Sequence, residues 1–285
     1  LDGDDSFPES AAWDPEERAF YTSSLGRGDV TQVAVTGETS TFFAGDDSND
    51  WVTVGLEIDV SRRQLWVCAS VFDGSAPGQL WVLDLDSGER VATHDLGAAK
   101  AEASCTDVNI APDGKAYVTD RANPNIYLVD PAAGTVQTWL EHAMLEPDLI
   151  GLNGVAFSPN GEYLLVTKYL EAELLRIPLA DSTEISAVQL DGDAFAGAGA
   201  LGGADDLLFV DNVLYVTVVD GLLRLTTNDA EWASATVAAT VLEQGGVTGL
   251  VLAEGQVYGA NGQAVEYSLG LSPDTPFWLR RLVAG

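Results

Sequence analysis

The sequence predicts an all-β protein, a six-bladed β-propeller with four antiparallel strands in each blade. Three observations indicate this fold. A short motif recurs six times at intervals of roughly 40 to 50 residues, a period typical of propeller blades. Runs of four to six residues rich in Val, Tyr, Trp and Thr alternate with turn residues, and no long helical periodicity interrupts them. Because a four-stranded sheet has two faces to bury, successive units must pack face to face around a closed ring.

All 285 residues are expected to form one domain, since closed all-β folds often reach this length. The expected blades cover residues 7–45, 52–97, 104–141, 151–192, 203–243 and 246–284. The first strand of each blade begins at one of six matched positions: Glu9, Val54, Thr106, Asn153, Asp205 and Thr248. Ten to twelve residues later, a second strand carries an apolar and usually aromatic residue: Phe20, Trp66, Tyr117, Leu165, Tyr215 and Tyr258.

The first two strands of a blade are joined by a hairpin turn, as in 112–114 and 159–161, where Pro or Asp starts the turn and Gly provides a positive φ. Third strands are expected at 80–84, 126–130 and 222–225. The fourth runs, such as 187–190, are more polar and are expected at the outer edges. Both ends of the chain read as full four-strand units, so we expect no strand exchange to close the ring.

Charge excludes one class of partner. The chain has 44 acidic and 13 basic residues and a net charge of −31, whereas nucleic-acid binding depends on Lys and Arg. The acidity predicts either a solvated surface suited to saline or extracellular surroundings, or a field that attracts a cation. No run approaches the roughly 18 apolar residues of a membrane span, so the sequence predicts a soluble protein, which we expect to be a monomer.

Two further features concern the compartment. The chain starts at Leu1 without an initiator Met, and a polar run follows, which suggests a removed export signal and an extracellular or periplasmic location. Cys68 and Cys105 are the two cysteines. We expect them to be buried free thiols, with a single disulfide as the alternative.

The six opening residues of the first strands should meet at the mouth of the central channel. Three of them, Glu9, Asn153 and Asp205, carry carboxylate or carboxamide oxygens, although Asp and Asn are poor strand formers. Such oxygens are the ligands that Ca²⁺ prefers, so the ring predicts a calcium site. The alternative is that these groups hydrate a water-filled channel or cap strand ends.

At these residues the chain resembles the senescence marker protein, gluconolactonase and luciferin-regenerating enzyme family, which is related to diisopropyl fluorophosphatase and paraoxonase. Glu9 four residues before Trp13-Asp14 matches the family's first metal ligand. The run 153–155 ahead of the turn 158–161 matches its Asn-Gly-apolar motif, and 204–207 matches its Ala-Asp-Gly-apolar motif with Asp206 in place of Gly. The resemblance covers essentially the whole chain.

The resemblance implies a calcium-dependent hydrolase of lactones, related esters or phosphotriesters that acts on a small molecule. It implies that Glu9, Asn153 and Asp205 hold Ca²⁺ or another divalent cation, and that Asp205 is the catalytic base or nucleophile. The candidate substrate contacts are Thr106, Asp107, Thr248 and Glu57.

The third blade departs from the family, because Thr106 stands where the family has a ligating Asn. A Thr hydroxyl is a shorter and weaker donor, so a water would complete the shell or the metal would be held less tightly. The competing hypothesis is a non-catalytic propeller that binds a small ligand, a structural ion or a protein. Loops 71–78, 140–150 and 194–202 are expected to wall the site, the last as a candidate lid or as an exposed insertion.

Overall fold

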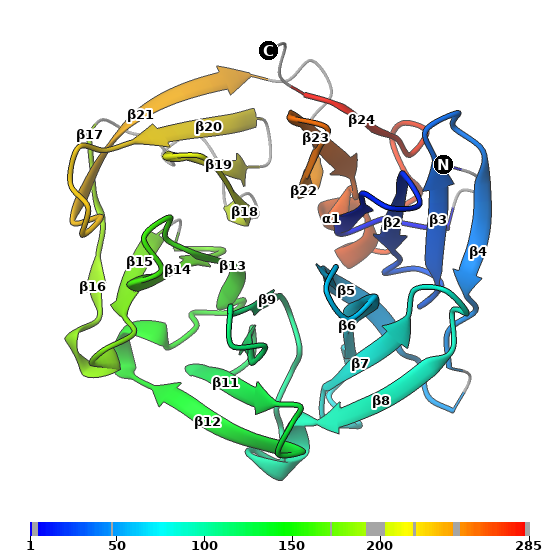
Figure 1. Ribbon diagram of the computed structural model, residues 1–285, viewed down its shortest axis with the longest axis horizontal. Helices are drawn as coiled ribbons and strands as arrows, with labels where there is room; N and C mark the ends of the chain where they lie inside the picture. The colour runs from blue at the N-terminus through cyan, green and yellow to red at the C-terminus, as the bar shows by residue number, and fades with distance from the viewer. Residues whose placement is uncertain are drawn as a thin grey trace.

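The computed structural model describes residues 1, 5–46, 48–171, 173–191, 203–218, 221–241 and 246–282. Six sheets surround a central axis, and the first strand of each sheet lies innermost (Figure 1). The predicted six-bladed propeller is therefore confirmed. None of the described helices is long and apolar enough to cross a membrane.

The first four sheets each contain four antiparallel strands, as expected. The first has β1 (Ala11–Asp14), β2 (Ala19–Ser23), β3 (Val30–Ala34) and β4 (Thr39–Phe43). The second has β5 (Val52–Asp59), β6 (Gln64–Ser70), β7 (Gln79–Asp84) and β8 (Arg90–Asp95). The third has β9 (Val108–Ile110), β10 (Ala116–Thr119), β11 (Asn125–Asp130) and β12 (Thr135–Glu141). The fourth has β13 (Leu152–Phe157), β14 (Tyr163–Lys168), β15 (Glu173–Pro178) and β16 (Ser186–Ala187).

The last two sheets differ in strand number. The fifth has β18 (Ala204–Val210), β19 (Val213–Val218), β20 (Gly221–Thr226), β21 (Ser234–Val241) and, at its outer edge, β17 (Gln189–Asp191). The sixth has β22 (Val247–Ala253), β23 (Gln256–Asn261) and β24 (Leu279–Arg281), with helix α1 (Ala264–Ser268) between β23 and β24. Three short 3₁₀ helices, η1 (Leu96–Ala98), η2 (Ala143–Leu145) and η3 (Ser182–Glu184), lie in connections.

The expectation of one fourth strand at 187–190 is wrong, because the chain changes sheets at Val188. Its N–H still bonds to Leu174 of the fourth sheet at 2.8 Å, but the next N–H, that of Gln189, bonds to Ala233 at 2.9 Å. The side chain of Val188 is buried in a cluster with residues of the fifth sheet. β17 therefore runs parallel to β21 and links the edges of two neighbouring blades.

The expectation of a full four-strand unit at the C-terminal end is also wrong for the described residues. Gln263 adopts φ 49°, in the left-handed region, and its side-chain oxygen accepts hydrogen bonds from the N–H groups of Asp274 and Thr275. The chain after β23 therefore turns into α1 and a loop before it returns as β24. As a result, α1 lies beside the central channel rather than extending the sheet (Figure 1).

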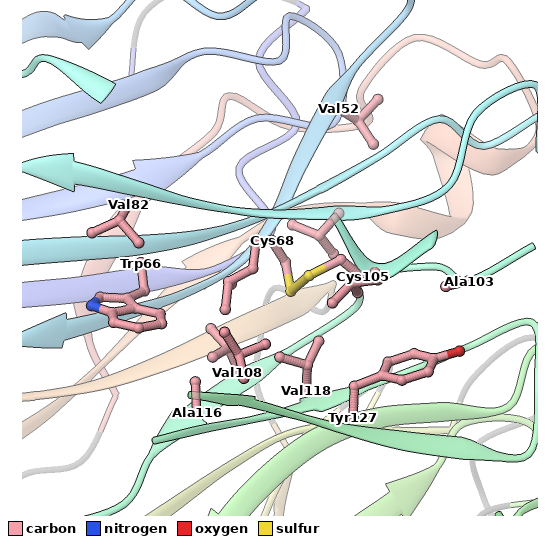
Figure 2. Packing of buried hydrophobic residues seen from close by; sticks show 14 of the residues in the cluster. Val52, Trp66, Cys68, Val82, Ala103, Cys105, Val108, Ala116, Val118 and Tyr127 are labelled. Atoms are coloured by element: carbon pink, nitrogen blue, oxygen red, sulfur yellow. A yellow bond between two sulfur atoms is a disulfide. The ribbon is translucent and has the colours of Figure 1, made fainter. Parts of the chain in front are cut away.

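The core lies between blades. β6 shows why: six of its seven residues are buried, because neighbouring sheets cover both of its faces. Trp66 of β6 lies in one buried cluster with Val82 of its own sheet and with Val108 and Tyr127 of the third sheet (Figure 2). Apolar side chains of adjacent sheets thus hold the ring together.

Cys68 and Cys105 form a disulfide, so the expectation of two free thiols is wrong. Cys68 lies in β6, and Cys105 lies in the segment that enters the third sheet, with a Cα–Cα distance of 5.0 Å (Figure 2). Ser70 aligns the two segments, because its hydroxyl both donates to the carbonyl of Cys105 and accepts from its N–H, each at 2.9 Å. Packing of the second blade against the third thus brings the two thiols within bonding reach.

Removing this disulfide should lower the free energy of unfolding. The two cysteines are 37 residues apart, and closing a loop of that length stabilises a protein by about 4 kcal/mol. We expect this loss in the double variant Cys68→Ala/Cys105→Ala, measured by urea unfolding. Reductant should destabilise the wild type and leave the double variant unchanged. Equal stability of the two proteins under oxidising conditions would contradict the prediction.

Candidate functional site

Five of the six opening residues of the first strands line one cavity at a mouth of the channel. The cavity has a volume of about 90 Å³. The five residues come from the first five blades: Glu9, Val54, Thr106, Asn153 and Asp205. The repeat therefore brings together the three oxygen-bearing residues that the sequence singled out.

Thr248, the sixth opening residue, does not line this cavity. Its hydroxyl lies 2.6 Å from the carbonyl oxygen of Glu9 and 3.3 Å from that of Pro8, and donates between them. It therefore joins the last blade to the first. The Thr106 hydroxyl accepts a hydrogen bond from the N–H of Arg121 at 3.0 Å, which leaves its own hydrogen for a ligand in the cavity.

The residues that follow the opening residues alternate around the ring. The first, third and fifth blades have Ser10, Asp107 and Asp206, and the second, fourth and sixth have Gly55, Gly154 and Gly249. Each polar side chain accepts the N–H of the residue after a glycine in another blade: Ser10 from Leu56 (3.3 Å), Asp107 from Val155 (2.9 Å) and Asp206 from Leu250 (2.6 Å). The alternation therefore fixes the inner strands to one another.

The glycines are needed because the inner strands approach so closely. A Cβ on Gly154 would lie 2.4 Å from the carbonyl oxygen of Asp205, and a Cβ on Gly55 would lie 2.4 Å from a carboxylate oxygen of Asp107. Near these glycines the pairing of β5, β13 and β22 with their second strands shifts register, as does that of β18. Such irregularities re-aim side chains at functional sites, and here Asn153 and Asp205 reach the cavity.

Glu9 and Asp205 form a buried acidic pair, with 8 % and 5 % of their surfaces exposed. Burial, followed by the charge of Asp205, raises the pKa of Glu9 well above its ordinary value. Burial, followed by the charge of Asp107, raises the pKa of Asp205 in the same direction. Ionising both groups in this place is unfavourable unless a positive charge joins them.

A cation fits this donor set. Oxygen Oε2 of Glu9 is buried and has no hydrogen-bond partner. Asn153, half-buried in the same cavity, adds an amide oxygen to the two carboxylates. The described residues contain no cluster of three or more His, Cys, Asp or Glu side chains suited to a metal, so the candidate set is two carboxylates and one amide. Hard cations take such oxygens together with water.

The other two predicted substrate contacts, Asp107 and Glu57, lie in a different place. They line a second cavity of about 210 Å³ along the central channel, together with Asp206. Burial raises the pKa of Asp107 to about 7. Burial, followed by the charges of Asp107 and Asp59, raises the pKa of Glu57 to about 8. The structure thus separates the predicted residues into a mouth set and a channel set.

Glu57 makes stability depend on pH. Because its folded-state pKa of about 8 lies above the ordinary value of 4.5, stability should fall as pH rises from about 4.5 to 8. Glu57→Gln removes this loss, so we expect it to raise the free energy of unfolding at pH 8.5 by about 2 to 4 kcal/mol and to have little effect at pH 4.5. Urea unfolding between about pH 4.5 and 8.5 measures the free energy of unfolding, with the substitution Glu38→Gln at an exposed position as control. An unchanged pH slope in Glu57→Gln would contradict the prediction.

Several cavity residues were not predicted: Leu25, Arg121, Tyr169 and three residues of α1. Phe72, Arg121 and Tyr169 share one position, one or two residues after the second strand of a blade. Because the second strand runs antiparallel to the first, it ends at the mouth where the first begins. The residues after each second strand could therefore have been predicted from the sequence to line the cavity. Helix α1 could not, because a helix of five residues is too short to show a helical periodicity in the sequence.

Two of the three predicted wall loops reach the cavity, through Phe72 of 71–78 and Ile150 of 140–150. The candidate lid at 194–202 falls outside the described residues. Tyr169, which is 8 % exposed, lies against the acidic pair, and burial followed by the charge of Asp205 raises the pKa of its hydroxyl. The cavity therefore has an acidic floor and largely apolar walls.

Comparisons with known proteins agree with this fold. A family model described as the SMP-30/Gluconolactonase/LRE-like region matches residues 7–222. The major allergen Mala s 1 of Malassezia sympodialis has a similar structure, with a TM-score of 0.70, 19% identity and coverage of 96% of this chain and 93% of that one. No curated protein has a significant sequence match to this chain.

Two further similar structures carry enzyme names. The first is XC5397 from Xanthomonas campestris, described as a gluconolactonase, with a TM-score of 0.67, 18% identity and coverage of 90% of this chain and 84% of that one. The second is a luciferin-regenerating enzyme, with a TM-score of 0.68, 13% identity and coverage of 95% and 87%. At these identities the similarity concerns the fold.

Proposed function

Because the chain belongs to the SMP-30/gluconolactonase/LRE-like family, we propose that it is a calcium-dependent hydrolase of lactones that acts at the mouth cavity. The observation that carries the proposal is the unpartnered, buried oxygen of Glu9 beside Asp205 and Asn153 in one cavity. The description of XC5397 as a gluconolactonase supports the choice of a lactone as substrate.

Glu9, Asn153 and Asp205 would hold the calcium ion, which when bound would supply a Lewis acid for the lactone carbonyl oxygen. Asp205 would accept a proton from the attacking water, whose oxygen adds to the carbonyl carbon. The ring C–O bond then breaks, the leaving oxygen takes up the proton, and a hydroxy acid results. Apolar walls from Leu25, Phe72 and Ile150 would exclude bulk water from this step.

The test combines a thermal melt with a substrate screen. Calcium should raise the melting temperature in a concentration-dependent way, and chelator should reverse the rise. The wild type should hydrolyse members of a panel of lactones. Aryl esters and phosphotriesters are screened in parallel as the two alternative substrate classes. Turnover confined to phosphotriesters, or no turnover and no calcium response, would refute the proposal.

Calcium affinity should depend steeply on pH. Because burial raises the pKa values of Glu9 and Asp205 well above their ordinary values, these carboxyls keep their protons to a higher pH and must lose them to bind a cation. Affinity should therefore fall as pH decreases, by up to about 100-fold per pH unit where both groups titrate. Calorimetric titration with CaCl₂ between pH 5.5 and 8.5 measures this. Glu9→Gln should reduce the steepness by half, and a pH-independent affinity in the wild type would contradict the prediction.

A second candidate function is ligand binding without turnover. Thr106, which stands where the family has a ligating Asn, favours it, because its hydroxyl already accepts the N–H of Arg121. This candidate predicts binding of small lactones without hydrolysis at saturating calcium. The substrate screen above separates the two.

We also propose that the protein works in an oxidising compartment, outside the cell or in the periplasm. The Cys68–Cys105 disulfide supports this, because such bonds persist where thiols are not kept reduced. Thiol labelling of the protein isolated from its native source tests it. Two free thiols in the folded protein would refute it.

A further inference from the structure

Arg121 is a buried cation of the mouth cavity that forms no ion pair with a described side chain. Eight of the thirteen basic side chains form ion pairs among the described residues, and Arg121 is not one of them. Its guanidinium carbon lies 3.6 Å from the centre of the Phe72 ring, and both residues line the cavity. Its Nε is buried and has no hydrogen-bond partner.

Two carboxylates act on Arg121 without forming an ion pair with it, because the charges of Asp120 and Glu9 both raise the pKa of its guanidinium. Asp120 accepts hydrogen bonds from Ser104, Ala122, Asn123 and Tyr127, which occupy both of its oxygens. Burial lowers the pKa of the Arg121 guanidinium, so the loss of water is not fully compensated within the chain. In a protein with 44 acidic side chains, leaving one buried arginine unpaired beside the site requires an explanation.

Guanidinium geometry indicates the missing partner. Its planar donors match a carboxylate in a two-point hydrogen bond, and stacking on an aromatic ring fixes its plane. Phe72 provides that ring. Leu25, Ile150 and Val265 line the same cavity with apolar side chains, which favour an apolar ring over one that carries the several hydroxyls of a sugar lactone.

We propose that Arg121 binds a carboxylate of the substrate, and that the substrate is a lactone whose otherwise apolar ring carries this carboxylate. The identification of the substrate as a lactone rests on the proposed function. The binding of a carboxylate by Arg121 does not, because an unpaired cation in the cavity would bind a carboxylate with or without turnover.

Calorimetry with a ligand that cannot be hydrolysed tests the anion site directly. Tetrahydrofuran-2-carboxylate has the ring and the carboxylate but no lactone carbonyl, and tetrahydrofurfuryl alcohol is the uncharged match. In saturating calcium, the wild type should bind the carboxylate at least about 10-fold more tightly than the alcohol. Arg121→Gln should abolish this difference, and Arg121→Lys should retain part of it.

Arg224→Gln is the matched control, because Arg224 also stacks on an aromatic ring, that of Tyr215, but is exposed and remote from the cavity. It should bind the carboxylate as the wild type does. Equal affinity of the wild type and Arg121→Gln for the carboxylate would overturn the inference and would indicate that the anion binds the calcium ion instead. No preference for the carboxylate in the wild type would also overturn it.

A kinetic arm uses two lactones that differ at one position: γ-valerolactone, which carries a methyl group, and 5-oxotetrahydrofuran-2-carboxylate, which carries a carboxylate. The wild-type ratio of kcat/KM should favour the carboxylate, and Arg121→Gln should lower this ratio at least about 10-fold. If the wild type hydrolyses neither, the proposed function fails, and the calorimetry still decides on Arg121. A ratio unchanged in Arg121→Gln would overturn the inference.

Discussion

Asp205→Asn should lower kcat/KM for a hydrolysed lactone at least about 10³-fold, because it removes the proposed base and one of the two charges that would hold the cation. Its calcium-dependent rise in melting temperature should disappear. In the absence of calcium, the variant should be as stable as the wild type or more so. Asn has the same shape as Asp, and the substitution removes a carboxyl whose pKa burial raises.

This combination of lost turnover and retained stability distinguishes a site residue from a structural one. The matched control is Asp191→Asn, at an exposed position of β17 on the outer edge of the ring, which should change neither quantity. Steady-state kinetics and thermal melts with and without calcium measure both. Retention of a tenth or more of wild-type turnover in Asp205→Asn would reject the assigned role.

Gly154→Ala should strongly destabilise the fold, with a loss of about 4 kcal/mol or more in the free energy of unfolding. The new Cβ would lie 2.4 Å from the carbonyl oxygen of Asp205, 2.9 Å from Cα of Asp206 and 3.0 Å from N of Leu207. All three atoms belong to the backbone, so no side-chain rotation relieves the contact. The Thr167 hydroxyl also donates to that carbonyl at 2.9 Å, and this hydrogen bond would be broken.

Urea unfolding followed by tryptophan fluorescence measures the loss. Gly134→Asn is the control, because Gly134 has φ 66° with no atom within 4 Å of an added Cβ, and Asn tolerates this conformation. It should change stability by less than about 1 kcal/mol. If Gly154→Ala were as stable as Gly134→Asn, the close approach of the fourth and fifth inner strands would not be a constraint on the fold.

The repeat made the ring of the mouth cavity predictable. Each first strand begins with a matched residue, and closure of a propeller brings those residues together whatever their distance in sequence. Glu9 and Asp205, almost two hundred residues apart in the chain, line one cavity for this reason. Their roles as metal ligands and base stay predictions.

The features that were missed depend on contacts between blades or on single residues outside the repeat. The pairing of Cys68 with Cys105 requires the distance between two neighbouring sheets, which no pattern within one blade contains. The change of sheet at Val188 depends on its burial against the fifth blade. Arg121 was overlooked because the matched positions considered were those of first strands, whereas it follows a second strand.

The way the ring closes has a consequence for ligand binding. Among the described residues, the first and sixth sheets share no strand, and β1 and β22 are joined across the junction by contacts such as the Thr248–Glu9 hydrogen bond. Glu9 lies on one side of this junction, and Asp205 lies in the blade before the sixth. An ion held by both side chains would therefore link the first blade to the fifth across this junction. Separation of the first blade from the rest of the ring would then require release of the ion, so a bound ion would resist unfolding from the N-terminal end.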